Sequence, residues 1–325
     1  MHVVIAVSSG SDSLSATLES LASCAFPTEY QGTVLVENGP VASFSHFATA
    51  GHPGIPNLIY VHEPIPGKSR ALNLAVDAAR SGLLVFFDDD VRFSPTVLQA
   101  YATSAQTAER KAYFGGPHQV LCEARRPEWL LPYLPASATS RLEDTVAANP
   151  SFTGFMGFNW AAYAEDILRL GGFNVQLGPG SVLNSVGDET EMQGRLRAEG
   201  VRPVFVRDAL VSHHVAAADC TPEWAIDRRY REGLWPGWTY YVDQHASSQT
   251  KPSLTRTRVP LWMHRLSLKL NAKAVASLFQ SPQEQFDRQY ELAWHRGFVE
   301  GYRSAQAHAR SRGAAPARRR TLATS

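Results

Sequence analysis

The chain has 325 residues, of which 44% are hydrophobic and 19% charged, and its formal net charge is +1 at pH 7. These values are typical of a globular protein with a large core, and the small net charge argues against a nucleic-acid partner. Cys24, Cys122 and Cys220 lie far apart without metal-ligand spacing, which indicates reduced thiols. Neither a signal peptide nor a membrane-spanning apolar run is recognisable, so we expect a cytoplasmic protein.

Strand and helix patterns alternate along the first part of the chain. Apolar, β-branched runs followed by turn residues predict strands at His2–Val7, Thr33–Val36 and Asn57–Val61. Apolar residues at helical spacing predict helices over residues 14–21 and 67–79. This alternation is typical of a mostly parallel α/β sheet flanked by helices, whose ligands bind at the carboxyl ends of the strands.

A buried strand is predicted to end in three consecutive acids. The five apolar residues Leu83–Phe87 run directly into Asp88, Asp89 and Asp90. Three neighbouring carboxylates repel one another, and a divalent cation relieves that repulsion because oxygen atoms are suitable ligands for it. Asp88 and Asp90 alternate to the same side of an extended chain, so they can converge on one ion. The alternative is a solvated, acidic junction between a strand and a loop.

The middle of the chain is less regular. Residues 123–150 contain four prolines and are predicted to form a loop-rich insertion. Two helices are expected after it, over residues 163–170 and 188–199. Ser185 and Asp188 fit a capping box at the start of the second helix.

The last third of the chain changes character. Residues 203–211 predict one or two strands that lead into His213. Residues 259–270 alternate bulky apolar and basic residues, which indicates either a helix packed on the main domain or a helix lying on an anionic membrane surface. Three parts are expected along the chain: a sheet domain over residues 1–240, a helical extension over 241–305 and a disordered basic tail over 306–325.

The order and spacing of these motifs resemble the family 2 glycosyltransferases, which have the GT-A fold. The resemblance covers residues 3–233. It implies an inverting transfer of a sugar, of the hexosyltransferase type, from a nucleoside diphosphate sugar to an acceptor hydroxyl. The motifs that carry it are Val36–Gly39, Gly67–Asn73, Phe87–Val91, Gly171–Phe173, Leu177–Gly180, Gly187–Glu191 and His213.

The acid triplet matches the D-x-D motif of that family. By position, the resemblance implies that Asp90 binds the metal directly, that Asp88 contacts the metal and the donor nucleotide, and that Asp89 has a lesser donor role. His213 matches a late histidine that completes the metal shell. Two carboxylates with one imidazole suit Mn²⁺ or Mg²⁺, and the imidazole favours Mn²⁺. Such an ion neutralises the leaving diphosphate.

The acidic pair Asp188 and Glu189 matches the family position of the catalytic base, with the usual order of the two acids reversed. We predict Glu189 as the base, because the first turn of a helix favours an ionised carboxylate, and keep Asp188 as the alternative. Glu37 occupies the position where the family more often has an Asp that holds the base of the nucleotide. The predicted donor-binding residues are Ser8, Glu37, Lys68, Arg70, Asp88 and Asp89.

Two other functions remain open from the sequence. A nucleotidyltransferase on a related fold usually has a Gly-rich, basic loop after its first strand, whereas residues 8–13 contain one glycine and no Lys or Arg. A non-catalytic protein that binds a nucleotide sugar or carbohydrate would have no reason to keep Asp90, Glu189 and His213 together. The acceptor stays open between a glycan, a lipid-linked molecule and a small molecule, and a lipid-linked acceptor would fit peripheral membrane contact.

Overall fold

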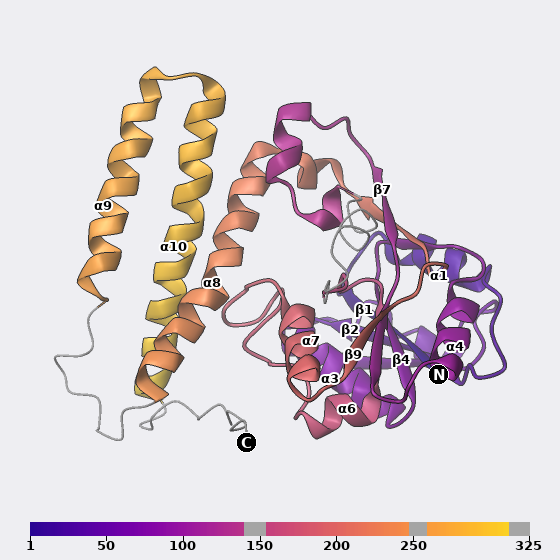
Figure 1. The fold of residues 1–325 in the computed structure, drawn as a ribbon. Coiled ribbons are helices and arrows are strands. Elements are labelled where there is room, and N and C mark those ends of the chain that lie inside the picture. The colour runs from indigo at the N-terminus through magenta and orange to yellow at the C-terminus, as the bar shows by residue number, and fades with distance from the viewer. Residues whose placement is uncertain (140–153, 247–258, 312–325) are drawn as a thin grey trace. The chain divides into compact units, whose positions relative to one another are not determined.

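A computed structural model describes residues 1–139, 154–246 and 259–311 (Figure 1). The chain divides into two compact units, Met1–Cys220 and Thr221–Ser325. The boundary predicted at residue 240 lies inside a long helix of the second unit. Part of the predicted basic tail, up to Ser311, is helical, and the rest of it lies outside the described residues.

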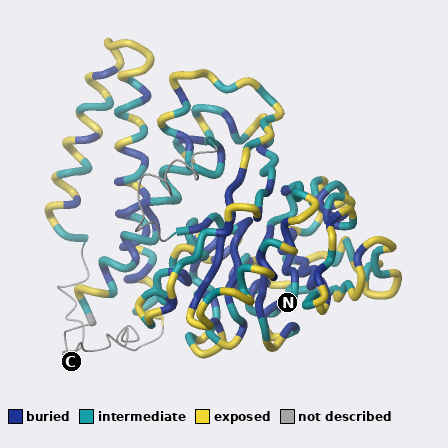
Figure 2. Tube along the Cα trace, turned by 45° about the vertical axis from the view of Figure 1, so that its right-hand side comes forward, coloured by how far each residue is buried: buried dark blue, intermediate teal, exposed yellow. Residues whose placement is uncertain are grey.

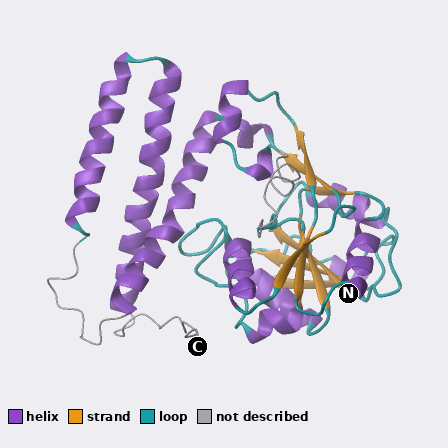
Figure 3. Ribbon diagram, in the orientation of Figure 1, coloured by secondary structure: helices purple, strands orange, loops and turns teal. Residues whose placement is uncertain are grey.

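The first unit is built on a seven-stranded sheet (Figure 3). Its strands pair in parallel except β8, which runs antiparallel to both of its neighbours, β4 and β6. The mostly parallel sheet predicted from the alternating patterns is therefore confirmed. In order across the sheet, the strands are β3 (Leu58–Glu63), β2 (Gly32–Asn38), β1 (His2–Ser8), β4 (Leu83–Asp88), β8 (Trp160–Tyr163), β6 (Ala112–Gly115) and β9 (Arg202–Phe205).

Helices cover both faces of this sheet. Alternate residues of β1 divide between two apolar cores, with Val3 and Ile5 facing one side and Val4 facing the other. The first core includes α1 (Leu14–Ala22) and α4 (Val97–Thr107), and the second includes α3 (Lys68–Ala79), α6 (Ala164–Arg169) and α7 (Asp188–Ala198). The short helix α2 (Phe47–Ala50) follows β2. Burial on both faces explains why these strands read as continuous apolar runs (Figure 2).

A second, three-stranded sheet continues from the end of β4. In it, β10 (Val211–Val215) lies between β5 (Val91–Phe93) and β7 (His118–Cys122). His213 lies within β10 and faces Val91 in the register. The described part of the predicted loop-rich insertion contains two 3₁₀ turns, Glu128–Tyr133 and Ala136–Ala138, and a third, Ala217–Cys220, ends the first unit.

The predicted capping box at the start of α7 is wrong. The N-cap of α7 is Gly187, with φ of 93°, in a left-handed conformation that favours glycine. Ser185 is buried, and its hydroxyl makes no hydrogen bond in the described structure. A capping box does form before α10, where the Ser281 N–H donates to the Glu284 carboxylate at 3.0 Å and the Glu284 N–H donates to the Ser281 hydroxyl at 3.3 Å.

The second unit contains the helices α8 (Pro222–Ala246), α9 (Leu261–Ala276) and α10 (Pro282–Ser311), with a 3₁₀ turn at Ser277–Phe279. Helices α8 and α10 touch through glycines spaced four residues apart on each helix: Gly233 and Gly237 on α8, Gly297 and Gly301 on α10. A Cβ atom at any of these four positions would overlap the backbone of the opposite helix. Among the described helices, none is both long and apolar enough to cross a membrane.

We predict that Gly237→Ala destabilises the second unit. The added methyl group would overlap the carbonyl oxygen of Phe298, so the helices must separate, at a cost of about 1–3 kcal/mol in the free energy of unfolding. Gly194→Ala in α7 is the matched control, because its Cβ would meet nothing closer than an Arg197 nitrogen at 4.0 Å. That change should stabilise by up to about 1 kcal/mol. Urea unfolding measures both, and equal effects would contradict close packing.

Candidate active site

Two of the three consecutive acids lie where the two sheets meet. Asp88 ends β4, and its carboxylate forms an ion pair with Lys68, the first residue of α3, at 2.5 Å. Asp90 follows two residues later, and its Oδ2 atom lies 3.3 Å from Nε2 of His213 on β10. The structure therefore brings together Asp90 and His213, which lie far apart in the sequence.

The His213 ring is held in one orientation. Its Nδ1 atom lies 2.9 Å from the carbonyl oxygen of Ser137, and because a carbonyl only accepts, Nδ1 carries the hydrogen. The ring stacks on Phe158 at 4.2 Å with the two planes nearly parallel. Nε2 therefore faces Asp90. It donates to the Asp90 carboxylate when the ring is protonated, and in the neutral ring, with the hydrogen kept on Nδ1, its lone pair would be available to a metal.

The middle acid of the triplet turns toward a different part of the chain. The hydroxyl of Ser11, in the loop before α1, donates to the carboxylate of Asp89. The hydroxyl of Thr17 donates to the main-chain oxygen of Asp89 at 2.5 Å. Burial raises the pKa of Asp89 to about 6, although the Ser11 hydroxyl opposes this shift. Asp89 thus anchors the triplet to the loop before α1.

The acidic corner carries more negative charge than its protein neighbours neutralise. Burial raises the pKa of Asp88, and the carboxylate of Asp90 adds to that effect, while the ammonium group of Lys68 opposes it. Burial alone would lower the pKa of His213, but its hydrogen bond with Asp90 and the negative charge of Asp90 raise the pKa above its ordinary value. A cation bound at this corner would relieve the remaining repulsion.

The residues at this corner fit a divalent cation in part. The Oδ1 atom of Asp90 is buried, with no hydrogen-bond partner in the described structure. In the described residues, however, no three His, Cys, Asp or Glu side chains are grouped closely enough to form a metal site. Asp90 and His213 are together, whereas Asp88 of the predicted ligand set pairs with Lys68. Two protein ligands are enough where substrate phosphates and water complete the shell.

The two acids predicted as candidates for the catalytic base lie near Lys68. Asp188 and Glu189 occupy the first turn of α7, and Asp188 is buried, with an Oδ2 atom that has no hydrogen-bond partner in the described structure. Burial alone would lower the pKa of Lys68, but the charge of Asp88, followed by those of Asp188 and Glu189, raises it. A Cβ at Gly157 would lie 3.3 Å from Cδ of Glu189, so the backbone at Gly157 lies beside that carboxylate.

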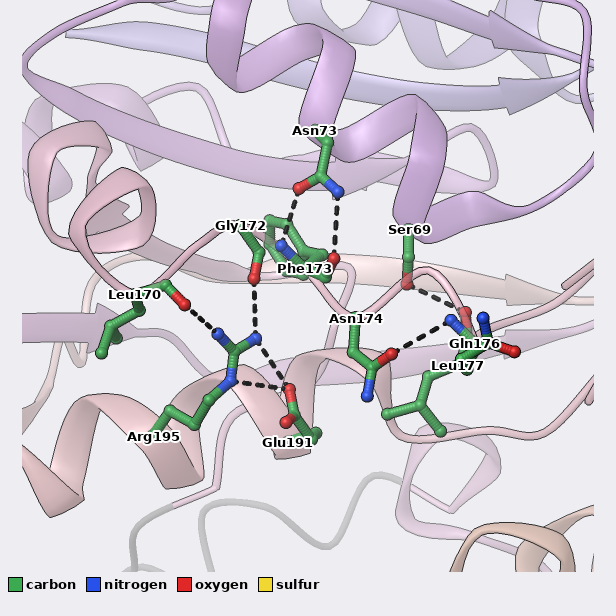
Figure 4. A network of polar contacts seen from close by, with 10 residues as sticks. All are labelled: Ser69, Asn73, Leu170, Gly172, Phe173, Asn174, Gln176, Leu177, Glu191 and Arg195. Atoms are coloured by element: carbon green, nitrogen blue, oxygen red, sulfur yellow. Dashed lines mark hydrogen bonds and ion pairs between the residues drawn. The ribbon is translucent and has the colours of Figure 1, made fainter. Parts of the chain in front are cut away.

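A polar network that the sequence analysis missed connects α3 to α7 (Figure 4). Asn73 of α3 accepts a hydrogen bond from the Phe173 N–H at 2.6 Å and donates to the Phe173 carbonyl at 2.9 Å. Arg195 of α7 donates to the carbonyls of Leu170 and Gly172, both at 2.8 Å, and pairs with Glu191. The network fixes the loop before α7, which precedes the two acids in the chain.

Comparison with known proteins identifies the chain. The model of "Glycosyl transferase family 2" matches residues 3–164. The chain belongs to glycosyltransferase family 2. The match contains Lys68 and all three acids of the triplet, while Asp188, Glu189 and His213 of this glycosyltransferase lie beyond it. A search of curated proteins finds no significant match.

The fold of the chain is similar to that of a solved glycosyltransferase, as expected for a GT-A-like fold. The mannosyltransferase PcManGT from Pyrobaculum calidifontis, solved with GDP-Man and Mn²⁺, is 18% identical with a TM-score of 0.50, over 95% of this chain and 86% of that chain. TarS 1–349 of S. aureus, solved with UDP, is 15% identical with a TM-score of 0.47, over 97% of this chain and 92% of that chain. At 18% identity the likeness to PcManGT concerns the fold alone, and the TM-score of 0.47 for TarS supports no conclusion about this chain.

Glu37 of the glycosyltransferase has partners other than the predicted nucleotide base. Its side chain is fully buried at the end of β2 and accepts hydrogen bonds from the Ser43 N–H at 2.7 Å, the Phe44 N–H at 2.9 Å and the Tyr60 hydroxyl at 2.6 Å. Burial alone would raise the pKa of Glu37, but these hydrogen bonds lower it below its ordinary value. In this structure, Glu37 is buried and its hydrogen bonds shape the loop after β2.

The other predicted donor contacts lie near the edge where the strands end. Ser8 is exposed at the end of β1, beside Asn38 in the register. Arg70 lies, partly exposed, in the first turn of α3.

We expect Glu37→Gln to lower the free energy of unfolding by about 1–3 kcal/mol, because an amide NH₂ group would face buried N–H donors that have lost their acceptor. Glu19→Gln in α1 is the control, since Glu19 is exposed and accepts a single hydrogen bond from Ser15. Denaturant unfolding of both variants in the absence of any nucleotide measures the effect. An unchanged stability for Glu37→Gln, together with weaker donor binding, would instead support direct contact with the base.

Proposed function

We propose that this glycosyltransferase transfers a hexose from a nucleoside diphosphate sugar to an acceptor hydroxyl, with inversion and with a divalent metal. The observation that carries the proposal is the pair of Asp90 and His213, with a buried Asp90 oxygen that lacks a partner. Its chemistry is that of a cation site, at the edge of the sheet where α/β proteins bind ligands. The family assignment supports a transferase over the nucleotidyltransferase and the binding protein that the sequence left open.

Asp90 and His213 would hold Mn²⁺ or Mg²⁺, which when bound neutralises the departing diphosphate. Lys68 keeps its proton beside Asp88, so its ammonium group adds a second positive charge at the same corner. Asp88 holds this ammonium group in place and contacts the donor. Ser8 and Arg70, near the same edge, contact the donor as well, while Asp89 and Glu37 position the loops around it.

Glu189 accepts the proton of the acceptor hydroxyl in this proposal. Three features support the assignment: its place in the first turn of α7, the positive charge of Lys68, and the close approach of Gly157 to its carboxylate. Asp188 is buried and serves as a positioning residue. A base that acts on the face opposite the diphosphate gives a single displacement and therefore inversion.

Glu189→Gln is predicted to lower the rate of sugar transfer or donor hydrolysis by about 10²–10⁴-fold while leaving donor affinity unchanged, because the amide cannot accept a proton. The assay follows release of nucleoside diphosphate, starting with GDP-Man and Mn²⁺, the pair in the PcManGT complex, and continuing with UDP-sugars. Asp188→Asn is measured in parallel. A larger loss of rate in Asp188→Asn would exchange the two roles, and release of pyrophosphate would reject the transferase.

His213→Ala should weaken the binding of Mn²⁺ by at least about ten-fold, since a direct ligand is lost. Isothermal titration with Mn²⁺ in the presence of nucleoside diphosphate measures this affinity without relying on turnover. His214→Ala is the matched control, because His214 is the next residue of β10 and its Nε2 atom lies 3.4 Å from the Glu123 carboxylate. Equal affinities of the two variants would remove His213 from the metal site.

The cellular location of the enzyme is also part of this proposal. We take the glycosyltransferase to act in the cytoplasm, with its second unit attached peripherally to a membrane.

A further inference from the structure

Helix α9 of the second unit is apolar on two sides. Its inner side contacts α10: Met263 and Leu270 are buried, the Ser267 hydroxyl lies 2.8 Å from Nε2 of His295, and the Arg296 side chain donates to Asn271 at 3.2 Å. A helix that packs against one neighbour normally carries polar residues on its other side. The outer side of α9 does not follow that pattern.

The outer side exposes large apolar residues in a row. Leu268 is 73% exposed and Phe279, in the 3₁₀ turn that follows α9, is 95% exposed. The residues of this outer apolar row are Leu261, Leu268, Val275, Leu278 and Phe279. They are five of the thirteen exposed large hydrophobic residues in the described chain, although they fall within a stretch of only 19 residues. Such a concentration marks a binding surface.

The stretch of sequence that carries this row has charges of one sign. Residues 244–283 contain no Asp or Glu and six Lys or Arg residues. Arg265 and Lys269 are exposed on α9 between the apolar residues of the row, whereas Lys273, one turn further along, lies 3.9 Å from the Glu291 carboxylate of α10. A partner that covers the outer side of α9 is therefore expected to carry negative charge. A second copy of the same helix would bring like charges together, which opposes self-association through this face.

We propose that the outer side of α9 docks on an anionic lipid bilayer, with the helix lying in the interface. Exposed Leu and Phe side chains enter the boundary between headgroups and acyl chains, while Arg265 and Lys269 pair with lipid phosphates. This docking surface is independent of the proposed sugar transfer, because it uses none of the residues assigned to that reaction.

Flotation of the full chain with vesicles tests the proposal. We expect binding to vesicles of equal parts phosphatidylcholine and phosphatidylglycerol, little binding to phosphatidylcholine alone, and weaker binding as salt is raised. The double variant Arg265→Gln/Lys269→Gln should bind the mixed vesicles about thirty-fold less tightly. Leu268→Gln/Phe279→Gln should lose at least ten-fold. Because all four side chains are exposed, these changes should leave the unfolding midpoint as in the wild type.

Leu168→Gln is the matched control, since Leu168 is an exposed leucine on α6 in the first unit, and it should bind vesicles like the wild type. Donor hydrolysis without vesicles should be the same in all these variants, so a failure of the sugar-transfer proposal leaves this test intact. Equal binding to neutral and anionic vesicles, or wild-type binding by both double variants, would overturn the proposal. A dimer that Leu268→Gln/Phe279→Gln dissociates, without vesicle binding, would instead assign the face to a second copy.

Discussion

The repulsion among the carboxylates that follow β4 is the constraint around which the first unit is built. Three acids in sequence cannot share one environment, and each has a partner from a different element: Lys68 of α3 for Asp88, Ser11 before α1 for Asp89, and His213 of β10 for Asp90. The sheet edge, both helical layers and the second sheet therefore meet at one corner. The same partners that separate the acids leave a buried Asp90 oxygen without a partner beside His213, which is the observation behind the proposed cation site.

Lys68 provides positive charge to the carboxylates of this corner. Its ammonium group pairs with Asp88, and the charges of Asp188 and Glu189 on α7 raise its pKa. One positive charge therefore balances an acid proposed to contact the donor and an acid proposed to act as the base. A point charge of this kind stabilises several carboxylates without fixing any of them geometrically. Geometry is supplied by the neutral hydrogen bonds around it: Asn73 on the backbone of Phe173, and Ser137 on the ring of His213. Charge and orientation are thus provided by different residues.

The fold was predictable from sequence where one local signal decided the structure. Apolar runs that end in turn residues marked β1, β2 and β4. β8 was missed because its four residues, Trp160–Tyr163, carry no period of their own, and their antiparallel pairing with β4 and β6 depends on distant partners. The capping box was misplaced for a related reason, since the pattern is short and the left-handed backbone at Gly187 excludes a side-chain cap there.

The candidate site divides in the same way. The acid triplet and the late histidine are visible in the sequence, and their pairing in space follows from the sheet edge. The burial of Glu37 could not be inferred, because it depends on Tyr60 and on two N–H groups of a loop, none of which has a distinctive pattern. Asn73 belongs to a motif that is visible in the sequence, but its positioning role follows only from its two hydrogen bonds to Phe173. Residues that contact ligands by charge leave a compositional signal, whereas residues that position the backbone leave none.

In the second unit, the pattern of exposed apolar and basic residues on α9 is plain in the sequence, but the fold alone does not account for it. The close packing of α8 and α10 explains the four glycines between them, since any side chain there would collide with the backbone of the opposite helix. The outer apolar row of α9 has no such explanation, because Met263 and Leu270 already supply the contact with α10. Exposed Leu and Phe side chains do not strengthen folding while they remain in water. Their presence beside cations, in a stretch free of acids, is therefore explained by binding at a charged surface.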